Sequence, residues 1–217
     1  MVRLNKIALA LFVIGGIITM FVLVLADDKD RKSFNDMSIQ EKNEFLENQI
    51  TKYKAGITEL IQYFEQDWKW EQNWDKEKVQ VNFCNLIKEY RAKEAVSLLV
   101  KHFDLIAYYG KESPITISNR FVLSALAEIG TPALEPVTEK ICSELGSLKY
   151  SEDTRHRIFF LRQALKSFSV EVLGKKLAIV FLEDKISGKD VSPQLKENIS
   201  TILEEIKQDK WIEKIGK

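Results

Sequence analysis

The sequence predicts an all-α protein: a short right-handed α-solenoid of about three helix-pair repeats, preceded by a long helix and an N-terminal hydrophobic segment. Three observations predict this fold class. Apolar residues recur at spacings of three and four along most of the chain, as on one face of a helix. One apolar pattern recurs at an offset of 39 residues, and a fixed period of about 40 residues is typical of stacked helical repeats. An uncharged apolar run occupies residues 7–26.

The first 26 residues have the pattern of a signal peptide or a signal-anchor helix. Arg3 and Lys6 precede the apolar run of residues 7–26, and two aspartates end it. Ala26 offers a small residue at a cleavage position, whereas the run is also long enough to span a bilayer. Both outcomes stay open: a membrane anchor with its N-terminus inside, or a secreted or periplasmic protein after cleavage. Either one places the rest of the chain outside the cytoplasm, because the positive charges stay inside.

A charged linker of residues 27–37 leads to residues 38–76, where we expect a long amphipathic helix and a Trp-rich connector. Ser38 and Glu41 fit a capping box at the helix start. The stripe of residues 39–64 follows heptad spacing with Asn43 at an inner position, and its apolar members are Ile39, Leu46, Ile50, Tyr53, Ile57, Leu60 and Phe64. This pattern indicates either a coiled coil between two chains or a helix that covers the first repeat.

Two groups of aromatic residues are the candidate partner-binding residues. Trp68, Trp70 and Trp74 lie in the connector, and Tyr108 and Tyr109 lie in an insertion between the first and second repeats. Exposed aromatic side chains often mark binding surfaces, and insertions in repeat proteins often lie on the binding face. The alternative for both groups is plain packing against the neighbouring core.

The helical repeats, with a capping helix at their C-terminal end, are expected over residues 77–208, before a tail of residues 209–217. In the clearest pair, Gly130 ends the first helix, Thr131 is the expected N-cap of the second, and Pro132 takes its first helical position. Pro136 still falls near the first turn and need not break that helix. Ser192 and Pro193 repeat the same cap-then-proline pattern before the last helix.

An offset of 39 residues aligns this pair with two others, so that each pair can bury its apolar face against the next. The first helices align at Phe83/Val122/Leu161, Leu86/Ala125/Ala164, Ile87/Leu126/Leu165 and Tyr90/Ile129/Phe168, and the second helices at Ala95/Leu134/Leu173 and Phe103/Cys142/Phe181.

The string ALAEIGTPALEPV, from Ala125 to Val137, resembles a HEAT repeat with its Ile-Gly-x-Pro-Ala turn. The other two copies depart from the motif, with Arg91-Ala92 and Ser169-Val170 in place of Gly-Thr. The resemblance covers residues 78–185, about half of the chain. It implies an α-solenoid that works by binding, and it transfers no catalytic residue.

The remaining chemistry of the chain favours binding over catalysis. Lys plus Arg and Asp plus Glu both number 32, which argues against a nucleic-acid partner. Cys84 and Cys142 are expected to be separate buried thiols, and His102 a half-buried, hydrogen-bonded ring. Arg155, His156 and Arg157 are expected to lie together on a solvated surface near a helix start. No metal-ligand spacing, phosphate-binding loop or nucleophile motif is present, so we expect no metal, no cofactor and no catalytic residues.

The sequence therefore predicts an extracytoplasmic, non-catalytic protein-binding scaffold whose protein partner is unidentified. One alternative is a structural spacer that forms a homodimer through the heptad helix of residues 39–64. The other alternative is an enzyme with an unrecognised acidic site.

Overall fold

The computed structural model describes residues 33–52, 56–71, 73–105, 120–188 and 190–208. Every regular element within these ranges is a helix, and no strand occurs in them. The all-α prediction is therefore confirmed. The chain divides into two compact units, Met1–Gln40 and Glu41–Lys217.

In the first unit, the described residues comprise the 3-10 helix η1 (Phe34–Asp36) and the start of helix α2 (Ile39–Lys52). The helix begins directly after Ser38, as the capping pattern predicts. The apolar segment of residues 7–26 lies outside the described residues. Within the part of the chain that the structure does describe, no helix has the length and apolar character needed to cross a membrane.

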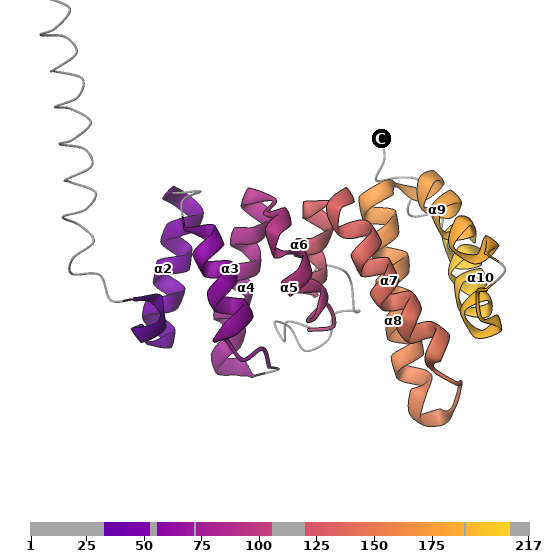
Figure 1. Ribbon diagram of the computed structural model, residues 1–217, viewed down its shortest axis with the longest axis horizontal. Helices are drawn as coiled ribbons and strands as arrows, with labels where there is room; N and C mark the ends of the chain where they lie inside the picture. The colour runs from indigo at the N-terminus through magenta and orange to yellow at the C-terminus, as the bar shows by residue number, and fades with distance from the viewer. Residues whose placement is uncertain (1–32, 53–55, 72, 106–119, 189, 209–217) are drawn as a thin grey trace, which may run out of the picture. The chain divides into compact units, whose positions relative to one another are not determined.

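The second unit holds the rest of α2 and a succession of further helices (Figure 1). They are α3 (Ile57–Gln66), α4 (Trp74–Tyr90), η2 (Lys93–Ala95), α5 (Val96–Val100), α6 (Phe121–Ile129), α7 (Thr131–Ser147), α8 (Glu152–Leu173), α9 (Lys175–Ser187) and α10 (Pro193–Gln208).

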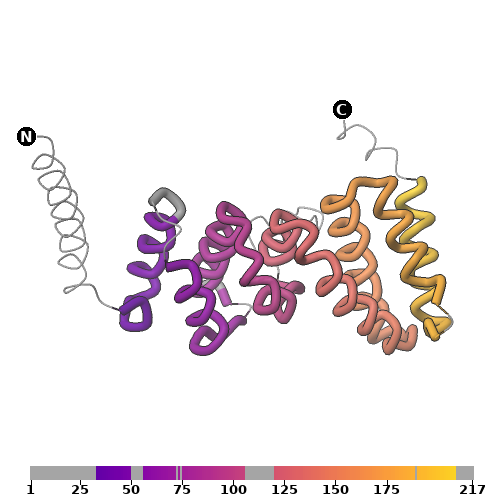
Figure 2. Tube along the Cα trace, turned by 45° about the horizontal axis from the view of Figure 1, so that its top comes forward, coloured from indigo at the N-terminus to yellow at the C-terminus, as the bar shows by residue number. Residues whose placement is uncertain are grey.

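Left-handed backbone conformations mark the turns between these helices. Gly56, Gly130 and Gly174 have positive φ angles and stand before α3, α7 and α9, while Arg91 follows α4 with a φ of 46°. Glycine takes such conformations without steric cost because it has no Cβ atom. The chain therefore turns back on itself at short connections, as between α8 and α9 in Figure 2.

The helices aligned by the 39-residue offset lie side by side. Helix α4 contacts α6, and α6 contacts α8; α5 likewise contacts α7. The aligned side chains of α4, α6 and α8 are buried, as predicted: Phe83, Val122, Leu161, Leu86, Ala125, Ala164, Ile87, Leu126, Leu165, Ile129 and Phe168. Tyr90 differs, because it is half-buried and its hydroxyl donates a hydrogen bond to the Gln49 carbonyl at 3.3 Å.

The predicted alignment of the third pair's second helix is wrong. Helix α8 continues through Ser169 and Val170 to Leu173, and the turn falls at Gly174. The offset between the turns at Gly130 and Gly174 is therefore 44 residues (174 − 130), five more than the offset of the first helices. Correspondingly, the buried residues of α9 are Ala178 and Leu182, whereas Phe181 is half-buried.

The single long helix predicted from residue 38 onward is also wrong. The structure has two helices, α2 and α3, and Gly56 before α3 has a φ of 101°, which a continuing right-handed helix does not allow. Leu60, Ile61 and Phe64 of α3 are buried. Burial of these three side chains within the second unit favours a turn at the glycine over a straight heptad helix.

Two helix starts refine the predicted caps. Gly130, and not Thr131, is the N-cap of α7, because α7 already begins at Thr131 and runs through Pro136. At α10 the prediction is confirmed: the helix begins at Pro193, and the Ser192 hydroxyl accepts a hydrogen bond from the Leu195 N–H at 3.2 Å. Helix α10 packs against α7, α8 and α9.

Candidate functional site

An aromatic cluster joins α3, α4 and the segment after α5. The rings of Phe64 and Phe83 are stacked with their centroids 3.8 Å apart, and both rings are fully buried. Trp70 meets Phe83 edge-on at 6.1 Å and stacks on His102 at 4.7 Å with an interplanar angle of 11°. Trp68 contacts Phe64 at 5.3 Å. The cluster holds the connector between α3 and α4 against the helices on both sides.

Hydrogen bonding fixes Trp70 more firmly than Trp68. The Trp70 indole N–H donates to the Phe64 carbonyl at 2.8 Å. The Trp68 indole nitrogen is buried without a hydrogen-bond partner, although the Lys76 ammonium lies 5.7 Å from the ring centroid. A buried indole N–H usually finds a hydrogen-bond partner. Because that of Trp68 has none, packing and the Lys76 ammonium hold this side chain in place.

The structure brings only some of the predicted partner-binding residues together. Trp68 is buried and Trp70 is half-buried in the aromatic cluster, and Trp74 is the first residue of α4. Tyr108 and Tyr109 lie outside the described residues. The packing of Trp68 and Trp70 agrees with the anchoring alternative, and a direct contact between any of the five aromatic residues and a partner stays a prediction.

His102 is half-buried, as predicted, and its ring stacks on the Trp70 ring, whereas the predicted hydrogen bond of the imidazole does not occur among the described residues. Burial lowers the pKa of its imidazole below 6.5, and the positive charge of Lys101 acts in the same direction, while Asp104 opposes both. The ring is therefore neutral at pH 7, where it can stack on the indole without a desolvated charge.

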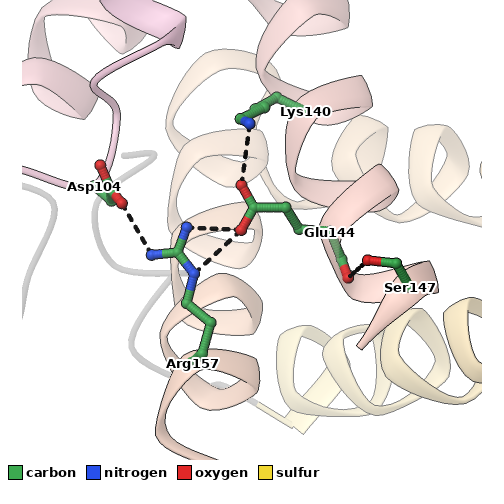
Figure 3. Close-up of polar contacts among 5 residues, drawn as sticks. All are labelled: Asp104, Lys140, Glu144, Ser147 and Arg157. Carbon is green, nitrogen blue, oxygen red and sulfur yellow. Dashed lines mark hydrogen bonds and ion pairs between the residues drawn. The ribbon is translucent and has the colours of Figure 1, made fainter. Parts of the chain in front are cut away.

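Arg157 connects three segments that are distant in the sequence (Figure 3). Its guanidinium donates to Glu144 Oε2 of α7 at 2.7 and 3.1 Å, and to Asp104 Oδ2 after α5 at 3.0 Å. Lys140 adds a second cation at 3.3 Å from Glu144. The guanidinium also lies 5.3 Å from the Phe160 ring centroid and 5.7 Å from that of Phe103. The network ties the start of α8 to α7 and to the segment that follows α5.

The protonation balance of Arg157 reflects these partners. Burial alone would lower its pKa, but the hydrogen bonds and charges of Glu144 and Asp104 outweigh burial and raise the pKa above the usual value of an arginine. The sequence interpretation treated Arg155, His156 and Arg157 together as a solvated surface. Arg155 and His156 are exposed, but Arg157 is half-buried. Its position next to the buried Ile158 of the α8 stripe is the signal that could have identified it.

Arg120, directly before α6, is a second functional candidate that the sequence interpretation missed. It is only 2% exposed, and its guanidinium carbon lies 4.1 Å from the centroid of the Phe160 ring. Burial lowers its pKa to about 10, so the side chain is still a cation at neutral pH. Two arginines thus share one aromatic ring of α8.

Both cysteines are free thiols with depressed reactivity. Cys84 is buried in α4 and Cys142 is half-buried in α7. Burial raises the pKa of both thiols, that of Cys142 to about 11, although Lys88 and Lys185 respectively oppose the rise. Because the thiolate is the reactive form, neither side chain is suited to nucleophilic chemistry.

Among the described residues, no group of three or more His, Cys, Asp and Glu side chains is arranged to hold a metal ion. In comparisons with known proteins, no family model, no curated protein and no solved structure matches this chain.

Proposed function

We propose that this chain is an extracytoplasmic HEAT-like repeat protein that acts as a non-catalytic scaffold for a protein partner. The observation that carries the proposal is the burial of equivalent side chains at a fixed offset. Phe83, Val122 and Leu161 are each fully buried, and the helices that hold them contact one another in succession. Stacked repeats bury their apolar faces in this way and leave a continuous surface for a partner.

The four helix-pair turns support the same interpretation and extend it by one pair. Helices α2 and α3 precede α4 and α5 as a further antiparallel pair, with Gly56 at the turn. Asn82 of α4 donates a hydrogen bond to Asn43 of α2 at 3.2 Å, again across an offset of 39 residues. In this proposal the right-handed solenoid has four helix pairs, and α10 caps its C-terminal end.

The scaffold is favoured over the dimeric spacer because four residues of the predicted heptad seam are already covered, although Ile39 is 37% exposed and Ile57 is half-buried. Asn43 is buried and bonded to Asn82, and Leu46, Leu60 and Phe64 are buried within the single chain. A coiled coil between two chains needs these side chains on its seam. Forming it would require α2 and α3 to leave α4, which exposes the aromatic cluster.

The location outside the cytoplasm rests on the N-terminal sequence pattern. Arg3 and Lys6 stay on the inner side, and everything after Asp27 is translocated. N-terminal sequencing of the protein purified from native membranes tests this proposal together with cleavage. A mature start at Asp27 indicates release, whereas an intact Met1 with residues 33–208 accessible to external protease indicates an anchor. Protection of residues 33–208 from protease in cells whose outer membrane or wall has been removed would contradict the proposal.

The binding role is tested by capture of the full-length chain with its partner from native membranes, followed by affinity measurement with the purified partner. Trp74→Ala and the double variant Tyr108→Ser/Tyr109→Ser are compared with Phe159→Ala, an exposed aromatic residue of α8 outside both groups. We expect at least one of the first two variants to weaken binding about tenfold, a loss of about 1.4 kcal/mol. Unchanged affinity in both would contradict the assignment of these residues.

A further inference from the structure

Among the residues that the structure describes, Arg120 is a buried cation without an anionic partner. Its Nε atom has no hydrogen-bond partner, and no ion pair joins its guanidinium to another residue of the described ranges. The Phe160 ring at 4.1 Å is the contact that the structure gives it. A charge taken out of water is costly unless it is paired, and a ring face offsets only part of that cost.

The neighbouring carboxylates do not neutralise Arg120. Asp104 and Glu144 are both bound by Arg157, with which they form hydrogen bonds of 2.7 to 3.1 Å. Arg157 shares the Phe160 ring with Arg120. The local arrangement therefore keeps one positive charge that no described carboxylate balances.

The N-terminus of α6 is a second, independent positive feature. Arg120 is the N-cap of this nine-residue helix, makes no side-chain cap, and is followed by a first turn that contains no acidic residue. The first N–H groups of a helix have no intrahelical acceptor and carry the positive end of the helix dipole. An arginine at this end is unfavourable unless an anion binds there.

We propose that Arg120 and the N-terminal N–H groups of α6 form a binding site for a carboxylate. A carboxylate is planar and accepts two parallel N–H bonds from a guanidinium fork, while its charge also complements the helix dipole. The group must be small, because Arg120 is almost fully buried. A free small carboxylate and an acidic side chain of a protein partner present the same chemistry. The site does not depend on the proposed scaffold function.

The test uses the full-length chain, labelled with ¹⁵N-arginine and titrated with sodium acetate against sodium chloride of equal ionic strength. The Arg120 Nε–H signal is assigned from its absence in Arg120→Lys. We expect acetate to shift this signal saturably and to raise Tm by about 3–6 °C at roughly ten times its Kd. An Arg120 signal that does not move, or that moves equally with chloride, overturns the proposal.

Two further variants keep the test independent of folding. Arg120→Met should lose the acetate-dependent rise in Tm, Arg120→Lys should keep part of it, and Arg155→Met, at an exposed position of α8, should keep all of it. An equal rise in wild type and Arg120→Met would overturn the site. A blocked Gly-Glu-Gly peptide distinguishes the two sources of the carboxylate. If the peptide binds more tightly than acetate, the ligand is an acidic side chain of a protein partner. If acetate binds and the peptide does not, the ligand is a free small carboxylate.

Discussion

Removal of the Phe83 side chain should test the packing of α3 against α4 most sharply. Phe83 is fully buried, and its ring is stacked at 3.8 Å on Phe64 and meets Trp70 at 6.1 Å. Core Phe→Ala substitutions cost about 3–5 kcal/mol, from lost burial and the cavity left behind. We therefore expect Phe83→Ala to lower the free energy of unfolding by that amount.

The assay is urea unfolding of the full-length chain in a mild non-ionic detergent, followed by tryptophan fluorescence and far-ultraviolet circular dichroism. A loss of this size lowers the urea midpoint by about 1 M or more. Phe159→Ala is the matched control, because Phe159 is 59% exposed on α8 and its removal should cost less than about 0.5 kcal/mol. If the two variants differ by less than about 1 kcal/mol, the assignment of Phe83 to a packed interface is wrong.

Three further predictions concern backbone, pH and charge. Gly174→Ala should lower the free energy of unfolding by about 1–3 kcal/mol, because a φ of 75° with a ψ of 159° suits glycine alone, even though no atom lies within 4 Å of an added Cβ. The control Ser187→Ala should lower it little. Equal losses for the two variants in urea unfolding would contradict this prediction. The folded pKa of His102 is lowered, so the unfolded chain binds the proton first, and stability should fall as pH drops from about 7 to 5. His102→Gln should reduce that fall, and an unchanged pH profile would exclude His102 as its source. A double-mutant cycle of Arg157→Met and Glu144→Gln should give a coupling free energy of about 0.5–1 kcal/mol, because both side chains are partly exposed to solvent. A coupling of zero would show that this ion pair does not stabilise the contact between α7 and α8.

The part of the fold that local pattern determines could be predicted from the sequence. Val122, Leu126 and Ile129 share one helix face and are all buried, and Gly130 makes the turn that follows them. The cap at Ser192 was equally predictable, because a hydroxyl before a proline is a local signal. In each case, the residues that decide the structure lie within a few positions of one another.

The rest depends on contacts between distant residues. Arg91 adopts a left-handed φ of 46° that nothing in its own sequence requires. Helix α8 runs five residues beyond the 39-residue pattern because Gly174, and not Ser169, is the residue that tolerates the turn. Heptad spacing suggested a continuous helix across Gly56, but burial of the α3 face favours a turn.

The candidate site was the least predictable part. Trp68 and Trp70 are close in the sequence, but their burial depends on Phe64, Phe83 and His102, which come from three different segments. Arg120 was missed because the sequence shows only an arginine before an apolar helix. Its lack of a partner is a property of the folded chain.

The central physical claim is that each helix pair buries its apolar face against the next pair. Hydrogen exchange of the full-length chain carrying Leu126→Ala tests it most directly. Leu126 is fully buried in α6, which contacts both α4 and α8, and the aligned Ile87 and Leu165 of those helices are fully buried too. The substitution should cost about 2–5 kcal/mol. We predict faster exchange in α4 and α8 as well as in α6, and no change for the exposed control Val180→Ala. Faster exchange confined to α6 and α7 would contradict the claim.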